Sequence, residues 1–154
     1  MTRQRYFEDF TAGECFTAPA RTLTDAHFLF FAGLTGDNHP IHYDAEYAKA
    51  TPFGERLTHG LLLASLTALG ATSLSAQVEE SMIAFLEQSA RFLRPVILGD
   101  TITPELEVAE LIPKRNRGIV RFTCRLRNQR GEIVLEGTHV YLMRRRISEA
   151  SPDA

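Results

Sequence analysis

The residues from Gly60 to about Leu74 form the longest apolar stretch of the chain, and this stretch restricts how the chain can fold. Apolar side chains occupy nearly every face of a helix drawn through it, and such a helix must be enclosed by other elements. The stretch is shorter than the ~20 residues that a bilayer needs, and Ser and Thr residues interrupt it. We therefore expect an enclosed core helix over residues 60–74, not a membrane span.

The second half of the chain has the period-two pattern of strands. The clearest case is residues 120–127, where apolar side chains at every even position alternate with Arg or Thr. Asn128 to Gly131 reads as a hairpin turn and residues 133–143 as the return strand. Earlier strands are expected over residues 82–92 and 101–111, and Pro104 indicates an edge or a bulge in the second of them. One enclosed helix followed by four long antiparallel strands is an α+β layout in which the sheet wraps the helix.

Composition restricts the setting in which the protein works. The 154 residues suit one domain, which we expect over residues 1–147, followed by a polar tail over residues 148–154. A formal net charge of -2 gives no general attraction to nucleic acid. The only two cysteines, Cys15 and Cys124, indicate reduced thiols, and residues 1–10 lack the apolar core of a signal peptide. We therefore expect a cytoplasmic protein with neither nucleic acid nor a membrane as a partner.

Residues 36–44, which read GDNHPIHYD, concentrate groups that transfer protons. Asp37 lies five positions before His42, and Pro40 restricts the backbone between them. A carboxylate and an imidazole can together hold a water molecule and move its protons near neutral pH. A second polar cluster at residues 58–60 opens the apolar stretch. The pattern predicts an active site built from a loop and the start of a buried helix.

Two short helices are expected around this segment. Thr24 or Asp25 can cap the first, over residues 26–34, and Gly36 suits its end. The second is expected around residues 44–49, with Asp44 as its cap.

Residues 36–44, with the segments 47–48, 51–54 and 59–65, resemble the MaoC-like, R-specific enoyl-CoA hydratase family. Segments at 6–14 and 92–100 are similar to it as well, so the resemblance covers roughly residues 6–143. It implies a hot-dog fold, in which an antiparallel sheet wraps a long central helix. It also implies a homodimer or larger homo-oligomer with sheets joined edge to edge. The implied substrate is an acyl-CoA thioester that enters near the subunit interface.

The resemblance assigns roles residue by residue. Asp37 and His42 match the catalytic aspartate and histidine, and Gly60 matches the glycine whose N–H polarises the thioester carbonyl. Ser65 matches a pocket serine that supports the aspartate. The implied reaction is hydration of a trans-2-enoyl-CoA to a 3-hydroxyacyl-CoA, or the reverse, with no cofactor beyond the CoA of the substrate.

Two further histidines belong to the candidate site. His39 stands where the family often has Asn, so this position is where we expect the substrate preference of the chain to differ. His59 precedes Gly60, and we expect it to shape the turn and its packing rather than to react. Tyr43 is expected to be a loop residue.

Three other functions compete with hydration. A hot-dog thioesterase commonly uses a carboxylate on the central helix, but residues 60–77 contain neither Asp nor Glu. A Zn or Mn site could use Asp37, His39, His42 and Asp44, although one proline-restricted loop rarely places four ligands correctly. A subunit that binds acyl-CoA without turnover would be expected to lack the Asp/His pair, which is intact here.

Basic residues could meet the phosphates of CoA. The candidates are Arg91, Arg94, Arg121, Arg125 and Arg127. Alternating Arg on a strand usually marks a solvated face, so we favour that interpretation for each of them while expecting some basic residue to contact CoA.

Overall fold

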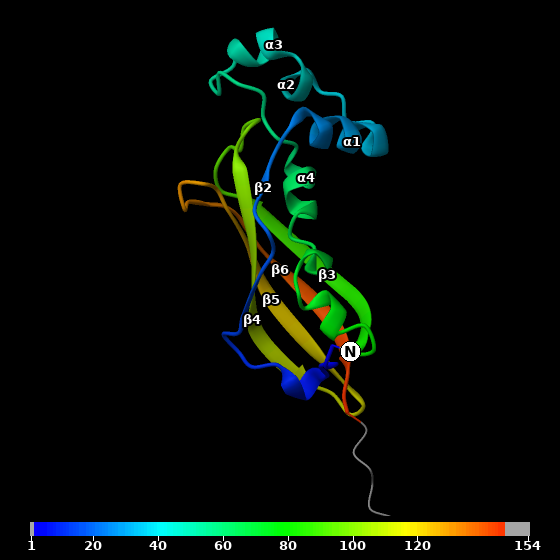
Figure 1. Cartoon of the computed structure of the whole chain (residues 1–154). Coiled ribbons are helices and arrows are strands. Elements are labelled where there is room, and N and C mark those ends of the chain that lie inside the picture. The colour runs from blue at the N-terminus through cyan, green and yellow to red at the C-terminus, as the bar shows by residue number, and fades with distance from the viewer. Residues whose placement is uncertain (1, 147–154) are drawn as a thin grey trace, which may run out of the picture.

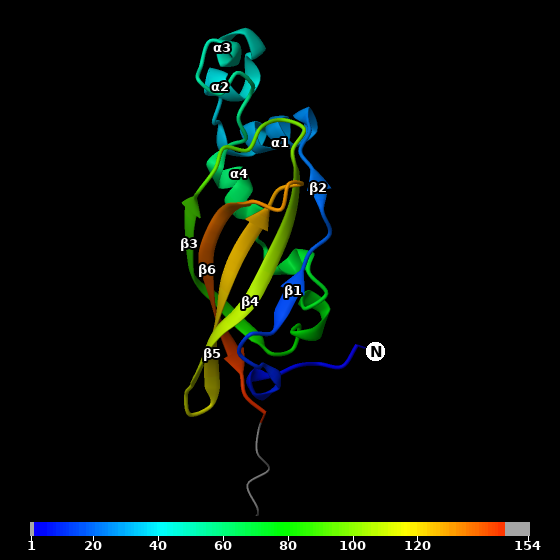
Figure 2. The same cartoon turned by 90° about the vertical axis from the view of Figure 1, so that its left-hand side faces the viewer.

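The computed structural model describes residues 2–146, so the tail expected over residues 148–154 lies outside the described part of the chain. Its main feature is one antiparallel sheet with the strand order β1-β4-β5-β6-β3, in which β2 also pairs with β4. The strands are β1 (Cys15–Thr17), β2 (Arg21–Thr22), β3 (Met82–Phe92), β4 (Thr101–Pro113), β5 (Arg117–Arg127) and β6 (Ile133–Arg144). Figure 2 shows β1 and β2 along one side of this sheet and β3 along the other.

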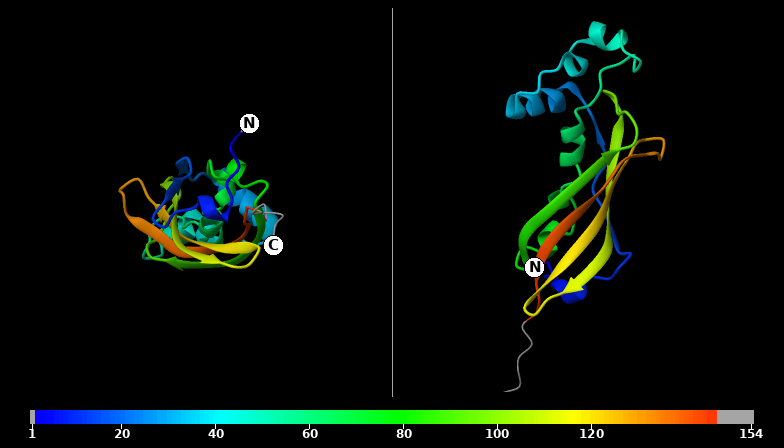
Figure 3. Two further views of the ribbon diagram at one scale, coloured as in Figure 1. Left: turned by 90° about the horizontal axis from the view of Figure 1, so that it is seen from below. Right: turned by 180° about the vertical axis from the view of Figure 1, so that it is seen from behind.

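The helices lie in the first half of the sequence. They are α1 (Asp25–Thr35), α2 (Pro40–Tyr43), α3 (Ala45–Lys49) and α4 (Gly60–Ser65). Figure 1 shows α4 against the sheet, while α1, α2 and α3 stand together beyond one end of it. Seen along the long axis, the sheet curves around the helical segments (Figure 3, left). This is the α+β, hot-dog arrangement that the sequence led us to expect.

The alternation in the second half of the chain is confirmed. The even positions Val120, Phe122, Cys124 and Leu126 are at most 1% exposed, and they pack into the core on the concave side of the sheet. Strands β5 and β6 meet around the predicted hairpin turn, where the N–H of Gly131 donates to the carbonyl of Asn128.

The expected long central helix is wrong in its length. Only Gly60–Ser65 is α-helical, and the chain continues as two single 3₁₀ turns, Leu69–Ala71 and Ser75–Gln77. The hydroxyls of Ser65, Thr67 and Thr72 each donate to the carbonyl three residues earlier, which competes with the backbone bonding of a continuous helix.

The enclosure of this segment is also partial. Leu62 and Leu63 are buried, but Leu61 is 70% exposed in the single chain.

Pro104 was expected to mark an edge or a bulge, and this is wrong: β4 is an inner strand and its bulge lies elsewhere. Strand β4 has neighbours on both sides, and its register shift against β5 falls between Val108 and Glu110. What coincides with Pro104 is a break in the neighbouring strand, because pairing with β4 ends at Thr17 and resumes at Arg21. The missing N–H of Pro104 therefore lies at this break between β1 and β2, where no strand residue is paired with it on that side of β4.

Candidate active site

The site forms where the chain passes from α1 to α4. Thr24 precedes α1, and Gly36 ends this helix in a left-handed conformation with φ 76°, which turns the chain into the loop that carries Asp37. His42 lies in α2, and Asp44 caps α3 by accepting the N–H groups of residues 46 and 47. The expected caps and helices are thus present, and the chain then returns to the sheet at the start of α4.

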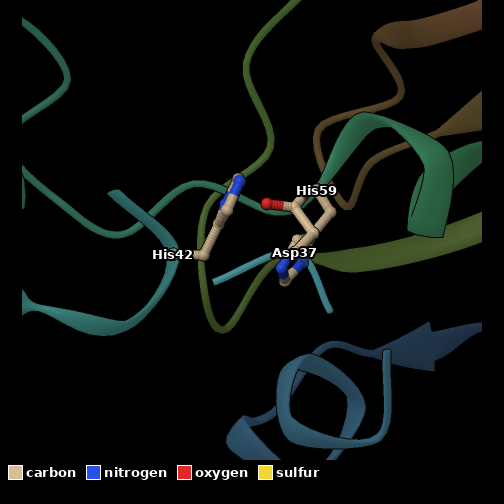
Figure 4. A group of neighbouring side chains, drawn as sticks. All are labelled: Asp37, His42 and His59. Atoms are coloured by element: carbon tan, nitrogen blue, oxygen red, sulfur yellow. The ribbon is translucent and has the colours of Figure 1, made fainter. Parts of the chain in front are cut away.

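This path brings Asp37, His42 and His59 together. One potential ligand atom from each lies within 4.8 Å of the others, and Figure 4 shows the carboxylate of Asp37 directed toward the ring of His42. Asp37 is exposed, His42 is half-buried and His59 is 1% exposed. The group therefore runs from solvent into the protein, with the two groups expected to react at its open side.

A hydrogen bond to the backbone of Leu57 fixes the orientation of the His42 ring. Its Nδ1 lies 2.8 Å from the carbonyl oxygen of Leu57. A carbonyl can only accept, so Nδ1 carries the proton and Nε2 of the neutral ring keeps a lone pair. His42 is therefore able to accept a proton at Nε2.

The half-buried Tyr43 and the buried His59 form a hydrogen-bonded network behind this pair. The Tyr43 hydroxyl lies 2.6 Å from Nε2 of His59 and 3.0 Å from the backbone carbonyl oxygen of Asp37. The rings of His42 and His59 are stacked, with centroids 3.8 Å apart and an angle of 24° between planes. Burial, and then the proximity of His42, lower the pKa of His59. The expected packing role of His59 thus falls directly against His42, whereas Tyr43 is a site residue that sequence reasoning missed.

Gly60 is the first residue of α4, so its N–H has no acceptor within the helix. It borders a pocket of about 300 Å³ that also includes Phe53, Phe92 and Arg94. A Cβ at Gly60 would lie 3.1 Å from Cζ of Phe92, so glycine keeps the backbone accessible from this pocket. The position suits a donor to a bound carbonyl oxygen.

Two expected site residues take other places. Ser65 is exposed and its hydroxyl donates to the carbonyl of Leu62 at 2.6 Å, so within residues 2–146 it has no hydrogen bond to Asp37. His39 caps α2, accepting the N–H of Ile41 at Nδ1, while its own N–H donates to Oδ1 of Asp37 at 3.4 Å. His39 therefore contacts the aspartate through its backbone rather than its ring.

The compact Asp37, His42 and His59 group could in principle hold a metal ion, and it differs from the set of four that the sequence suggested. The nearly parallel rings of His42 and His59 direct their in-plane lone pairs side by side rather than toward one point. Nε2 of His59 is also occupied by Tyr43. The donor set thus fits hydrogen bonding better than tetrahedral coordination.

Most of the candidate arginines face glutamates across the sheet. Arg121 pairs with Glu110, Arg125 with Glu107 and Glu136, and Arg127 with Glu105. Arg94 differs, because it borders the Gly60 pocket and its ion pair with Glu132 is long at 3.9 Å.

The class of this protein is defined by its similarity to a known family. Residues 9–127 match the family model described as "MaoC like domain", so the chain belongs to the MaoC-like domain family.

Individual relatives agree with this assignment. The chain is 35% identical over 135 residues to the 3-hydroxybutyryl-CoA dehydratase of Methylorubrum extorquens, covering 88% of this chain and 82% of that protein. It is 33% identical over 132 residues to the (R)-specific enoyl-CoA hydratase of Rhodospirillum rubrum, covering 86% and 87%. Among solved structures, the R-hydratase PhaJ1 from Pseudomonas aeruginosa aligns with a TM-score of 0.76 and 30% identity over 99% of this chain and 97% of that one.

Proposed function

We propose that this protein adds water to a trans-2-enoyl-CoA to give a 3-hydroxyacyl-CoA, and catalyses the reverse dehydration. The observation that carries the proposal is the meeting of the Asp37 carboxylate and the His42 ring beside the start of α4. The names of the relatives, an enoyl-CoA hydratase and a hydroxyacyl-CoA dehydratase, support the same chemistry.

In the proposed reaction, Asp37 and His42 hold one water molecule between them. One of the two takes a proton from the water as its oxygen bonds to Cβ. The other enters the step protonated and gives its proton to Cα on the same face, and the proton taken from the water restores the pair for the next turnover. The lone pair at Nε2 and the proton at Nδ1, bonded to Leu57, suit His42 to this exchange. In dehydration the same groups act in reverse.

The thioester carbonyl is proposed to accept the N–H of Gly60. As water adds, negative charge moves onto this oxygen, and a backbone donor already in place stabilises it. The pocket at Gly60 leads past Phe92 to Arg94, which we propose as a basic residue for a CoA phosphate.

The test follows the loss of enoyl-CoA absorbance with purified protein. Asp37→Asn and His42→Gln should each lower kcat by about 10²-fold or more, because each removes one acid/base group. Glu46→Gln, an exposed change outside the site, should leave the rate unchanged. Wild-type rates in both single variants would refute the mechanism.

Measurements of thiol release and of acyl-CoA binding on the same protein separate the alternative functions. Release of free CoA thiol without hydration would identify a thioesterase. Acyl-CoA binding without any turnover would identify a non-catalytic subunit. A panel of enoyl-CoA substrates varied in chain length and branching would then define the acyl group.

We further propose that the reaction needs no metal or added cofactor, so dialysis against a chelator should leave the rate unchanged. For the setting, we propose the cytoplasm, supported by the two free thiols Cys15 and Cys124. Within residues 2–146, no helix has the length and apolar character needed to cross a bilayer.

We propose that the chain works as a homodimer or larger homo-oligomer, with β3 joining the sheets. Strand β3 ends the sheet on one side, and Ile83, Phe85 and Leu86 on it are 44–51% exposed. A long edge strand with exposed apolar side chains is usually paired or covered.

A further inference from the structure

One part of the site has no role in the reaction as proposed. Tyr43 and His59 lie behind the acid/base pair, bonded to each other at 2.6 Å. Phe28 and Phe31 of α1 pack against the ring of His59, with centroids 5.5 and 4.8 Å away. His59 is 1% exposed, and its Nδ1 has no hydrogen-bond partner within the described part of the chain. The burial of the His59 ring needs a reason, because its nitrogens give up their bonds to water.

The protons in this network can be assigned by counting donors and acceptors. The Tyr43 hydroxyl has one proton and faces two carbonyl oxygens, of Asp37 at 3.0 Å and of Phe28 at 3.2 Å, which can only accept. If that proton goes to a carbonyl, Nε2 of His59 must donate to the hydroxyl oxygen. The alternative would take the hydroxyl proton away from the Asp37 carbonyl and leave an N–H buried at Nδ1 without an acceptor, which is costly.

The two stacked rings therefore carry their protons on opposite nitrogens. His42 is protonated at Nδ1, where it bonds to Leu57, and His59 at Nε2, where it bonds to Tyr43. Each ring is held from a different side by a bond to a fixed group, and the contact between them is face to face.

We propose that Tyr43 and His59 form a positioning unit, in which one hydroxyl fixes the backbone of Asp37 and, through the His59 ring, the plane of His42. This inference rests on the proposed function, since it concerns how the acid/base pair of that function is held in place. Tyr43 follows His42 directly in α2, so its hydroxyl ties α2, the Asp37 loop and the start of α4 to one point. Neither residue is given a proton transfer to substrate.

The surroundings of His59 favour its neutral form beside His42. Burial and then the nearby His42 lower the pKa of His59. A positive charge on His59 would oppose the gain of a proton by the His42 ring 3.8 Å away.

The kinetic test uses Tyr43→Phe, which removes only the hydroxyl. We expect kcat to fall at least tenfold with KM unchanged within about twofold, because the bonds of the hydroxyl to Asp37 and to His59 are both lost. Tyr47→Phe is the matched control, because Tyr47 is a neighbouring, exposed tyrosine outside the network, and it should keep the wild-type kcat. His59→Phe, which keeps an aromatic ring, and the double variant should each lose no more than Tyr43→Phe, since neither removes a bond of this unit that Tyr43→Phe leaves in place.

The second measurement does not depend on activity. Nitrogen-15 NMR of labelled histidine should show the proton of His42 on Nδ1 and that of His59 on Nε2 at neutral pH, with the His59 signal altered in Tyr43→Phe and unaltered in Tyr47→Phe. A proton on Nδ1 of His59, or a charged His59 ring, would overturn the inference.

The outcomes also separate the positioning unit from the proposed hydratase function. Absence of hydration by the wild type refutes the proposed function, and the NMR measurement then still decides how the ring is held. A wild type that hydrates, with equal kcat in Tyr43→Phe and Tyr47→Phe, refutes the positioning unit alone.

Discussion

Gly60 lies where the start of α4 meets the ring of Phe92. In Gly60→Ala the new methyl group would be 3.1 Å from Cζ of Phe92, and because this ring is 52% exposed it can move aside. The melting temperature should therefore change little. The methyl group would nevertheless narrow the pocket in front of the Gly60 N–H, so kcat/KM should fall at least tenfold in the hydration assay. A variant with an unchanged kcat/KM would show that the carbonyl is held elsewhere.

His139 is a buried histidine of β6 that lies apart from the candidate site. It is 2% exposed, and its Nε2 lies 2.9 Å from the hydroxyl of Thr67, which itself donates to Ala64. Burial lowers the pKa of His139 from 6.5 to about 4. The signal that could have found it is its place at an odd position of β6, among residues that alternate toward the core.

This shift predicts a pH dependence of stability. Between pH 6.5 and 4 the unfolded chain binds a proton at His139 that the folded chain does not, so the free energy of unfolding falls as the pH falls through this window. The loss is up to about 3 kcal/mol in total. In His139→Gln, which can still donate to Thr67, urea unfolding from pH 7 to 4.5 should show a shallower decline than in the wild type. Equal slopes would contradict the assignment.

At the scale of elements, the contact of β6 with β3 depends on one glycine. A Cβ on Gly137 would lie 2.0 Å from the backbone oxygen of Ser89, and a backbone atom in a strand ladder has little room to move. Gly137→Ala should therefore lower the free energy of unfolding by about 2–4 kcal/mol. The matched change Gly33→Ala in α1 meets nothing within 4 Å and should raise it by about 0.5–1 kcal/mol. Similar effects of the two changes in urea unfolding would contradict this account.

The interruption of α4 is also decided at this scale. Hydrophobic periodicity predicts a helix through Leu74, because apolar side chains dominate the segment. The hydroxyls of Thr67 and Thr72 instead bond to nearby carbonyls, and Thr67 is held by His139 from the sheet. That last contact joins residues 72 positions apart, and no local pattern reports it.

For the whole molecule, the proposed association through β3 can be tested by adding charge to that edge. The double change Ile83→Lys and Leu86→Lys places two positive charges on exposed apolar positions of the strand, so the dimer should dissociate into monomers in light scattering. Glu79→Lys changes the net charge by the same amount just before the strand and should leave the dimer intact. A double variant that stays dimeric would place the interface on another surface.

Much of the architecture follows from local pattern. The alternation of residues 120–127 gives the buried face of β5, and the caps of α1 and α3 are visible as Thr24 and Asp44. The order of the strands in the sheet could not be predicted from local pattern. Strand β3 pairs with β6, the last strand of the chain, rather than with its neighbour β4. Pairing between strands depends on loop lengths and on the closure of the sheet, which single-strand patterns do not contain.

By itself the sequence determined the fold class, the family resemblance and the pairing of Asp37 with His42, because these depend on periodicity and on groups close together along the chain. Only the tertiary structure decided what stands behind that pair. His59 lies 17 positions after His42, yet its ring stacks on it at 3.8 Å, and Tyr43 joins both to the backbone of Asp37. Such contacts arise when α1, α2 and the start of α4 pack together, and they are decided by distances between elements rather than by the order of residues.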